Sequence, residues 1–342
     1  MDINLLTEDQ LALLNQLISE SEHIVICCHK SPDGDALGAS LAWAEFLRSK
    51  AKLPLVAIPD AFPDYLRWLP CTETLVRYDR RKELVEEAFR QADLVFCLDF
   101  NSTSRVDEME QALASSPAKK VLIDHHLNPD MDTVLSISYP EMSSTCELVF
   151  RILWQMGEYP MMTRKMTLPI YCGMMTDTGG FTYNSTRPEI YFIISMLLDK
   201  RIDKDLIYRN VYNNYSEWAI RLRGYIMDQK LHVFEQQHAA YYAVTRSEMA
   251  AYHFIKGDLE GLVNEPLRIK GMKLSISLRE DSEKDNLIWV SLRSVDDFPC
   301  NLLAERFFNG GGHLNASGGK LFCSMDEAEE IVRKAISQAS TI

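Results

Sequence analysis

The sequence lacks any apolar run long enough to cross a membrane. A membrane-spanning helix needs about 18 or more consecutive apolar residues, and no stretch of the 342 residues approaches that length. The start, Met1-Asp2-Ile3-Asn4, also lacks the basic stretch with which a signal peptide begins. Together these absences predict a cytoplasmic protein with no membrane partner.

Cysteines are present, but they lack the spacing of a disulfide framework or of a zinc finger. Most of the eight cysteines lie within or beside apolar runs, as buried thiols do in proteins of a reducing compartment. Cys28 directly precedes His29, and we interpret it as a small core residue. A soft thiolate fits poorly among the oxygen-rich groups that follow.

The chain also has fewer basic residues than acidic ones. The chain has 36 Lys and Arg against 49 Asp and Glu, which gives a formal net charge of −13. A protein that binds long nucleic acids through many phosphate contacts carries the opposite balance. The composition therefore favours short RNA oligonucleotides or small phosphorylated nucleotides as partners. A few basic side chains at the binding site would be enough to hold either of them.

What the sequence does contain is a set of short islands rich in aspartate and histidine. Three apolar, strand-like runs end directly before such a residue, at His29, Asp99 and Asp124. In an open α/β sheet, the carboxyl ends of the strands form the edge where ligands bind. A lone aspartate at such a place is usually a helix cap or a turn residue. The recurrence of the pattern in several islands instead predicts one shared site.

The residue types in these islands are those of a metal site. Hard carboxylate oxygens with some imidazole favour Mn²⁺ or Mg²⁺ over structural zinc. The candidate ligands are too many for one open catalytic ion, but they suit two. Two ions about 3.5–4 Å apart can bind both the attacking and the leaving oxygen in phosphoryl hydrolysis. The candidate ligands are His29, Asp33, Asp35, Asp99, His125 and Asp177.

Together these islands resemble the four motifs of the DHH phosphoesterase superfamily. The motifs are His29-x-x-x-Asp33-x-Asp35, Asp99, Asp124-His125-His126 and Asp177-Thr178-Gly179. The glycine-rich stretch from Asn309 to Gly319 is similar to the signature of the accompanying DHHA1 domain. The resemblance covers nearly the whole chain in the family's order. In size and layout it is closest to the NrnA-like group of bifunctional oligoribonucleases and 3′,5′-bisphosphate nucleotidases.

The resemblance implies how the acidic site is used. Two divalent ions, with Mn²⁺ expected over Mg²⁺, would share Asp99. One ion would bind His29, Asp33 and Asp99, and the other would bind Asp35, Asp99, His125 and Asp177. His126 would contact a phosphoryl oxygen or protonate the leaving oxygen, and Asp124 would orient a ligand histidine.

Candidate substrate-binding residues lie in the second half of the chain. Consecutive glycines allow bare backbone N–H groups to approach an anion, and Arg293 matches a position that the family uses against phosphate. The expected substrate-binding residues are Arg293, Gly310, Gly311, Gly312, His313 and Asn315. Arg279, Lys270 and Lys273 are interpreted as solvated charges, and Arg105 is left open between a structural and a functional role.

The order of segments predicts two domains joined by helices. Strand-like and helix-like segments alternate first, for example a helix over Lys82–Gln91, a strand over Leu94–Leu98 and a helix over Met161–Met175 that leads to Asp177. Such alternation predicts a doubly wound, mostly parallel sheet. We expect a DHH catalytic metal-binding domain over residues 1–190, a helical connector over 191–232 and a smaller mixed α/β DHHA1 substrate-binding domain over 233–342. The active site is expected in the cleft between the two domains.

The resulting hypothesis is a dinuclear metal-dependent phosphoesterase. It would hydrolyse short oligoribonucleotides to mononucleotides and remove the 3′-phosphate of adenosine 3′,5′-bisphosphate (pAp). The alternative is a phosphodiesterase for cyclic or linear dinucleotides of the c-di-AMP or pApA type. A non-enzymatic nucleotide sensor would predict a broken ligand set, yet every expected ligand position is filled. The sequence ranks neither these substrates nor Mn²⁺ against Mg²⁺, and it leaves open whether the chain forms a homodimer.

Overall fold

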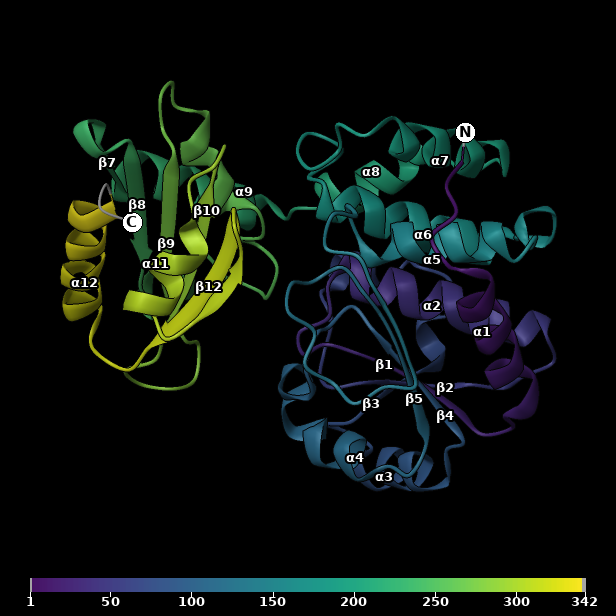
Figure 1. The fold of residues 1–342 in the computed structure, drawn as a ribbon. Coiled ribbons are helices and arrows are strands. Elements are labelled where there is room, and N and C mark those ends of the chain that lie inside the picture. The colour runs from purple at the N-terminus through teal and green to yellow at the C-terminus, as the bar shows by residue number, and fades with distance from the viewer. Residues whose placement is uncertain (1, 340–342) are drawn as a thin grey trace. The chain divides into compact units, whose positions relative to one another are not determined.

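The computed structural model describes residues 2–339 and divides after Asn214 into two compact units (Figure 1). Unit 1 ends at Asn214, and unit 2 begins at Tyr215. The expected first and last domains also include residue 1 and residues 340–342, which lie outside the described residues. Of the segment expected to connect the domains, residues 191–232, one part folds with each unit.

Unit 1 is built on a parallel sheet of six strands in the order β3-β2-β1-β4-β5-β6, with every neighbouring pair parallel. From β1 the chain winds outward to one edge, returns to place β4 beside β1, and winds outward to the other edge. This is the doubly wound arrangement, and the predicted fold class is confirmed. The strands are β1 (Ile24–Cys28), β2 (Leu55–Ile58), β3 (Leu75–Arg77), β4 (Leu94–Leu98), β5 (Lys119–Asp124) and β6 (Leu135–Ser138).

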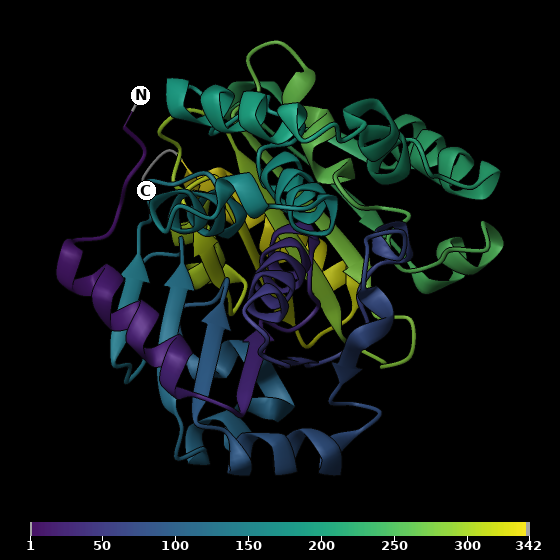
Figure 2. The same cartoon turned by 90° about the vertical axis from the view of Figure 1, so that its right-hand side faces the viewer.

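Helices cover both faces of this sheet (Figure 1 and Figure 2). Ile26 of β1 faces the core that contains α1, α2, α5 and α6, while Val25 and Cys27 face the core that contains α3 and α4. Because both faces are buried, the central strands are apolar throughout, as parallel sheets require. The helices are α1 (Glu8–Glu20), α2 (Gly34–Ser49), α3 (Lys82–Gln91), α4 (Glu110–Ser115), α5 (Thr145–Gln155), α6 (Arg164–Asp177), α7 (Pro188–Asp199) and α8 (Lys204–Tyr212).

Unit 2 is built on a mixed sheet in the order β11-β12-β10-β9-β8-β7, in which only the β8–β9 pair is parallel. Helices α11 (Cys300–Phe307) and α12 (Met325–Gln338) pack on one face. On the other face, α9 (Glu217–Tyr225) and α10 (Arg246–Ala251) pack against β8. The strands are β7 (Leu231–Phe234), β8 (Ala239–Val244), β9 (Leu274–Glu280), β10 (Ile288–Ser294), β11 (Gly311–His313) and β12 (Ala316–Leu321). Between residues 2 and 339, no helix has the length and apolar character needed to cross a membrane.

A buried ion network fixes the start of α5 in unit 1. The carboxylate of Glu147, in the first turn of this helix, is fully buried. It accepts hydrogen bonds from Nε of Arg151 at 2.9 Å, from Nη2 of Arg187 at 2.7 Å and from Oγ of Ser143 at 2.7 Å. Arg151 is itself only 4% exposed, and its buried guanidinium forms an ion pair with this carboxylate. The network therefore ties the first turn of α5 to the segments before and after it.

We expect Glu147→Ala to lower the free energy of unfolding by about 3–5 kcal/mol, because it leaves a buried guanidinium without its counterion. Asp64→Ala is the matched control in the same unit, since Asp64 pairs with Arg67 at 2.7 Å but both side chains are largely exposed. That change should cost less than about 1 kcal/mol. Urea denaturation followed by circular dichroism measures both, and equal small losses would show that the buried network contributes little.

Candidate metal centre

The predicted metal ligands converge at the point where the strand order of unit 1 reverses. His29 follows the last residue of β1, Asp99 follows the last residue of β4, and Asp124 is the last residue of β5. β1 and β4 are neighbours from which the chain winds in opposite directions. In doubly wound sheets, the loops at such a switch point diverge and leave room for a ligand.

The start of α2 contributes two carboxylates. Asp33 caps the helix, with its Oδ1 accepting hydrogen bonds from the backbone N–H groups of Asp35 and Ala36, both at 3.0 Å. Asp35 lies in the first turn and is fully buried. Its oxygens accept backbone N–H groups from the start of α5, Thr145 at 2.6 Å and Cys146 at 2.8 Å. Even so, burial and the nearby carboxylates raise the pKa of Asp35 well above its ordinary value.

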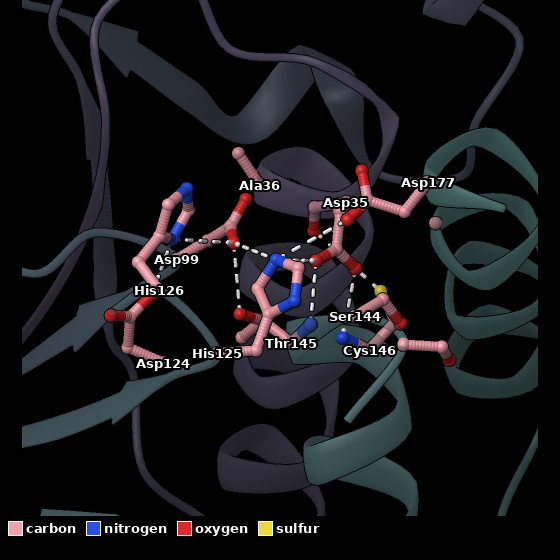
Figure 3. Close-up of polar contacts among 12 residues, drawn as sticks. Asp35, Ala36, Asp99, Asp124, His125, His126, Ser144, Thr145, Cys146 and Asp177 are labelled. Atoms are coloured by element: carbon pink, nitrogen blue, oxygen red, sulfur yellow. Dashed lines mark hydrogen bonds and ion pairs between the residues drawn. The ribbon is translucent and has the colours of Figure 1, made fainter. Parts of the chain in front are cut away.

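Asp99 occupies the centre of the site (Figure 3). Its Oδ2 lies 3.4 Å from Nε2 of His29 and its Oδ1 lies 3.5 Å from Nε2 of His125, so its two oxygens face different histidines. Burial alone would raise the pKa of Asp99, but hydrogen bonding to His29 and the neighbouring imidazoles hold it well below its ordinary value. The residue has a φ of +66°, a strained backbone of the kind that clusters at functional sites.

His125 joins Asp99 to the fourth motif. Its Nε2 lies 3.2 Å from Oδ2 of Asp177, the last residue of α6. Its Nδ1 lies 3.3 Å from the carbonyl oxygen of Met142 and donates to it. That hydrogen bond directs the lone pair of Nε2 towards the carboxylates, which is how a metal-binding histidine is oriented. Burial raises the pKa of Asp177, and the negative charge of the nearby Asp35 raises it further.

Asp124 and His126 form a hydrogen-bonded pair beside Asp99, whose Oδ1 lies 3.8 Å from Nδ1 of His126. Oδ1 of Asp124 accepts a hydrogen bond from Nδ1 of His126 at 2.7 Å. The histidine that Asp124 contacts is therefore His126, whereas the expected ligand His125 is held by the Met142 carbonyl. Asp124 is fully buried, and its Oδ2 has no hydrogen-bond partner among the described residues.

The assembled residues fit divalent cations. Carboxylates packed this closely repel one another unless positive charge lies between them. Burial first, and then this repulsion, raise the pKa values of Asp35 and Asp177. In each of three groups, the ligand atoms lie within 4.8 Å of one another. The groups are His29, Asp33 and Asp99; Asp35, His125 and Asp177; and Asp99, Asp124 and His126.

A close approach of three helices positions the cluster. A Cβ added at Gly173 of α6 would lie 2.3 Å from Sγ of Cys146 on α5 and 2.9 Å from Oδ1 of Asp35 on α2. Only glycine therefore allows α6 to pass this close to α2 and α5. Because Asp177 ends α6, the same packing places its carboxylate beside His125.

Sequence reasoning missed the residues that hold the ligands in place. Oγ1 of Thr145 donates to Oδ1 of Asp99 at 2.9 Å, while its backbone N–H donates to Asp35. A signal for this helix start is present in the sequence, because Ser144 followed three residues later by Glu147 has the spacing of a capping box. The hydroxyl of Ser144 does accept the backbone N–H of Glu147, at 3.0 Å.

Comparison with known proteins agrees with these motifs. Residues 23–174 match the N-terminal domain of the DHH family, and residues 241–340 match the DHHA1 domain. The chain belongs to the DHH family. It is therefore a hydrolase that acts on phosphoester bonds, and the predicted family membership is confirmed.

This DHH-family chain is similar to three proteins with informative names. A solved structure of an exopolyphosphatase-related protein from Bacteroides fragilis is 48% identical, with a TM-score of 0.93, and covers 97% of this chain and 96% of its own. The bifunctional oligoribonuclease and PAP phosphatase NrnA of Thermus thermophilus is 28% identical over 93% of this chain and 90% of its own length. The cyclic-di-AMP phosphodiesterase GdpP of Geobacillus thermodenitrificans is 24% identical over 94% of this chain but only 48% of its own.

The glycine island of the DHHA1 domain forms a tight β-hairpin rather than an open loop. Strand β11 pairs with β12, and a Cβ added at Gly310 would lie 1.8 Å from the carbonyl oxygen of Gly318. Asn315, beside the turn, donates to Oγ of Ser294 at 2.9 Å and to the carbonyl oxygen of Asp296 at 3.1 Å. Close backbone packing therefore accounts for this glycine, and the expected substrate contacts of the island stay a prediction.

The hydroxyl of Thr145 should be needed to orient Asp99. We expect Thr145→Val, which keeps the shape and the backbone N–H, to weaken Mn²⁺ binding about ten- to hundredfold. Thr145→Ser, which keeps the hydroxyl, should bind close to the wild type. Isothermal titration with Mn²⁺ measures both, and equal affinity of Thr145→Val and the wild type would contradict this role.

Proposed function

We propose that this chain is a dinuclear metal-dependent phosphoesterase that hydrolyses short oligoribonucleotides to mononucleotides and removes the 3′-phosphate of pAp. The observation that carries the proposal is the position of Asp99, whose two carboxylate oxygens face two separate groups of ligands. The 28% identity to an oligoribonuclease and PAP phosphatase, over 93% of this chain, supports the choice of substrates.

Two groups of side chains would hold the cations. His29, Asp33 and Asp99 would bind one, and Asp35, Asp99, His125 and Asp177 would bind the other. Their mix of hard oxygen and imidazole donors suits Mn²⁺, with Mg²⁺ as the competing ion. Bound cations would supply neutralising charge, polarise the phosphoryl oxygens and lower the pKa of water.

His126 is proposed to transfer a proton at the leaving oxygen. Its Nδ1 donates to the buried carboxylate of Asp124 at 2.7 Å, which fixes the ring orientation and the tautomer. This leaves Nε2 as the atom that exchanges a proton with the substrate. The arrangement follows the logic of a carboxylate that holds an imidazole base in place.

Arg105 is proposed to contact the substrate rather than to support the fold. Its carbonyl oxygen accepts the backbone N–H of Lys30 at 2.8 Å, which places it near the ligand His29. Its side chain is exposed and pairs with no carboxylate among the described residues. A guanidinium without a counterion beside an acidic site is suited to a phosphate. Arg293 of the DHHA1 domain is proposed for the same chemistry.

A phosphodiesterase for cyclic or linear dinucleotides is the second candidate. The observation that favours it is the match of GdpP over 94% of this chain, which spans both domains. A hydrolysis panel of diadenylate, pApA, pAp and c-di-AMP with each metal separates the two candidates. Turnover of c-di-AMP well above that of the other compounds would replace the first proposal with the second, and no turnover of any compound would favour the sensor.

Removing the shared carboxylate should stop the reaction. We expect Asp99→Ala to lower kcat by more than about a hundredfold, because both cations lose a ligand. Asp99→Asn should do the same with less effect on the fold, since Asn tolerates the left-handed backbone at this position. Asp132→Ala, at an exposed aspartate of the same unit, is the control. Near-normal turnover of Asp99→Ala with Mn²⁺ would rule out the two-metal assignment.

Activity should fall as the substrate grows. Because the chain carries a net charge of −13, a long phosphate backbone is repelled outside a local binding site. We expect turnover to decrease from two nucleotides to beyond about five, with weak and salt-sensitive binding of long single strands. A ladder of oligoribonucleotides from two to about 24 residues tests this. Rates that stay flat or rise with length would favour a processive exonuclease.

A further inference from the structure

One face of the unit 2 sheet is polar where β9 and β10 run side by side. On β9 the alternate residues Leu274, Ile276 and Leu278 enter the core beneath α11 and α12. The residues between them point to the other face, as strand geometry requires. These are Ser275, Ser277 and Arg279 on β9, and Trp289, Ser291 and Arg293 on β10.

The strand register orders these residues into one strip. Arg293 lies opposite Ser275, Ser291 opposite Ser277, and Trp289 opposite Arg279. Arg279 and Arg293 therefore mark the two ends, about 13 Å apart along the strands, with serines between them. Tyr242 of β8 lies opposite Ser277, at the middle of the strip. Burial raises the pKa of Tyr242, and this rise is opposed first by hydrogen bonding with Ser277 and then by the charges of Arg223, Arg293 and Arg279.

Neither arginine has a carboxylate partner among the residues from 2 to 339. Arg293 donates only to the carbonyl oxygen of Leu292 at 2.9 Å, and Arg279 only to that of Glu280 at 3.5 Å. Burial lowers the pKa of Arg279, and Asp281 offsets this in part. Asp281 is itself held by the indole N–H of Trp289 at 2.7 Å. In contrast, Arg333 on α12 is paired with Glu329.

A buried hydroxyl in the same strip also lacks a partner. Ser275 is fully buried, and its Oγ makes no hydrogen bond among the described residues. Buried polar atoms are nearly always hydrogen-bonded, so an exception needs an explanation. Here the unpartnered oxygen lies opposite a guanidinium that has no counterion, in a protein with an excess of acidic residues. A bound anion would satisfy both groups.

We propose that the strip formed by Arg279, Ser277, Ser291, Ser275 and Arg293 binds an anionic group at each end, and that Arg279 holds a phosphate of the substrate that is not hydrolysed. The inference rests on the proposed function and narrows its substrate class to nucleotides with two phosphate groups. A 5′-phosphorylated dinucleotide and a nucleoside 3′,5′-bisphosphate both belong to this class. The strip assigns Arg279, interpreted from the sequence as a solvated charge, to substrate binding.

Two diadenylates that differ only at the 5′ end test the proposal. For Arg279→Gln we expect the KM for the 5′-phosphorylated compound to rise about tenfold or more, because a charge-assisted hydrogen bond is lost. The KM for the 5′-hydroxyl compound should change less than about twofold. Arg279→Lys, which keeps the charge, should recover part of the difference, and Arg333→Gln should behave as the wild type. Equal effects of Arg279→Gln on both compounds, or no effect on either, would overturn the proposal.

A binding measurement separates this proposal from the proposed function. Isothermal titration of the full chain with pyrophosphate, in the presence of a chelator, requires neither a bound metal nor turnover. We expect the wild type to bind pyrophosphate at two sites, Arg279→Gln to bind about tenfold more weakly at one of them, and Arg333→Gln to be unchanged. If no diadenylate is hydrolysed but pyrophosphate binds in this pattern, the proposed function fails and the anion site stands. Pyrophosphate binding that is absent, or unchanged in Arg279→Gln, would overturn the site.

Discussion

The acidic site depends on the backbone N–H groups at the start of α5. Asp35 is fully buried, and a buried carboxylate is costly unless donors or cations surround it. Thr145 and Cys146 supply two of those donors, and the hydroxyl of Thr145 supplies a third to Asp99. The position of α5 is set in turn by the Glu147 network and by the close contact at Gly173. The packing of these helices therefore also determines the positions of the ligand carboxylates.

The two units contain clusters of opposite charge. In unit 1, carboxylates are gathered without enough positive charge, which prepares a site for cations. On the polar face of the unit 2 sheet, Arg279 and Arg293 stand without carboxylates in a chain that has many, which prepares a site for anions. Phosphate groups bind metal ions and guanidinium groups alike, so each arrangement by itself suits a phosphorylated ligand.

Much of the fold follows from the alternation of apolar runs with helical periodicity. The helix over Lys82–Gln91 and the strand over Leu94–Leu98 have the predicted bounds. The strands that sequence reasoning missed are short and lie towards the edges of their sheets. β3 has three residues and β6 has four, so neither presents an apolar run that stands out from a loop. Their pairing with β2 and β5 decides their conformation.

The sequence by itself determined the family, the doubly wound sheet and the titratable residues at its strand ends. These follow from local patterns, since each candidate ligand lies just after a strand, at a helix cap, or in the first or last turn of a helix. Only the tertiary structure decided which atoms meet. Thr145 lies 110 residues from Asp35 along the chain, and the guanidinium of Arg279 lies over the ring of Phe254, with Cζ 5.7 Å from the ring centroid. Hydrogen bonds and ion pairs between distant segments depend on packing, which no local pattern encodes.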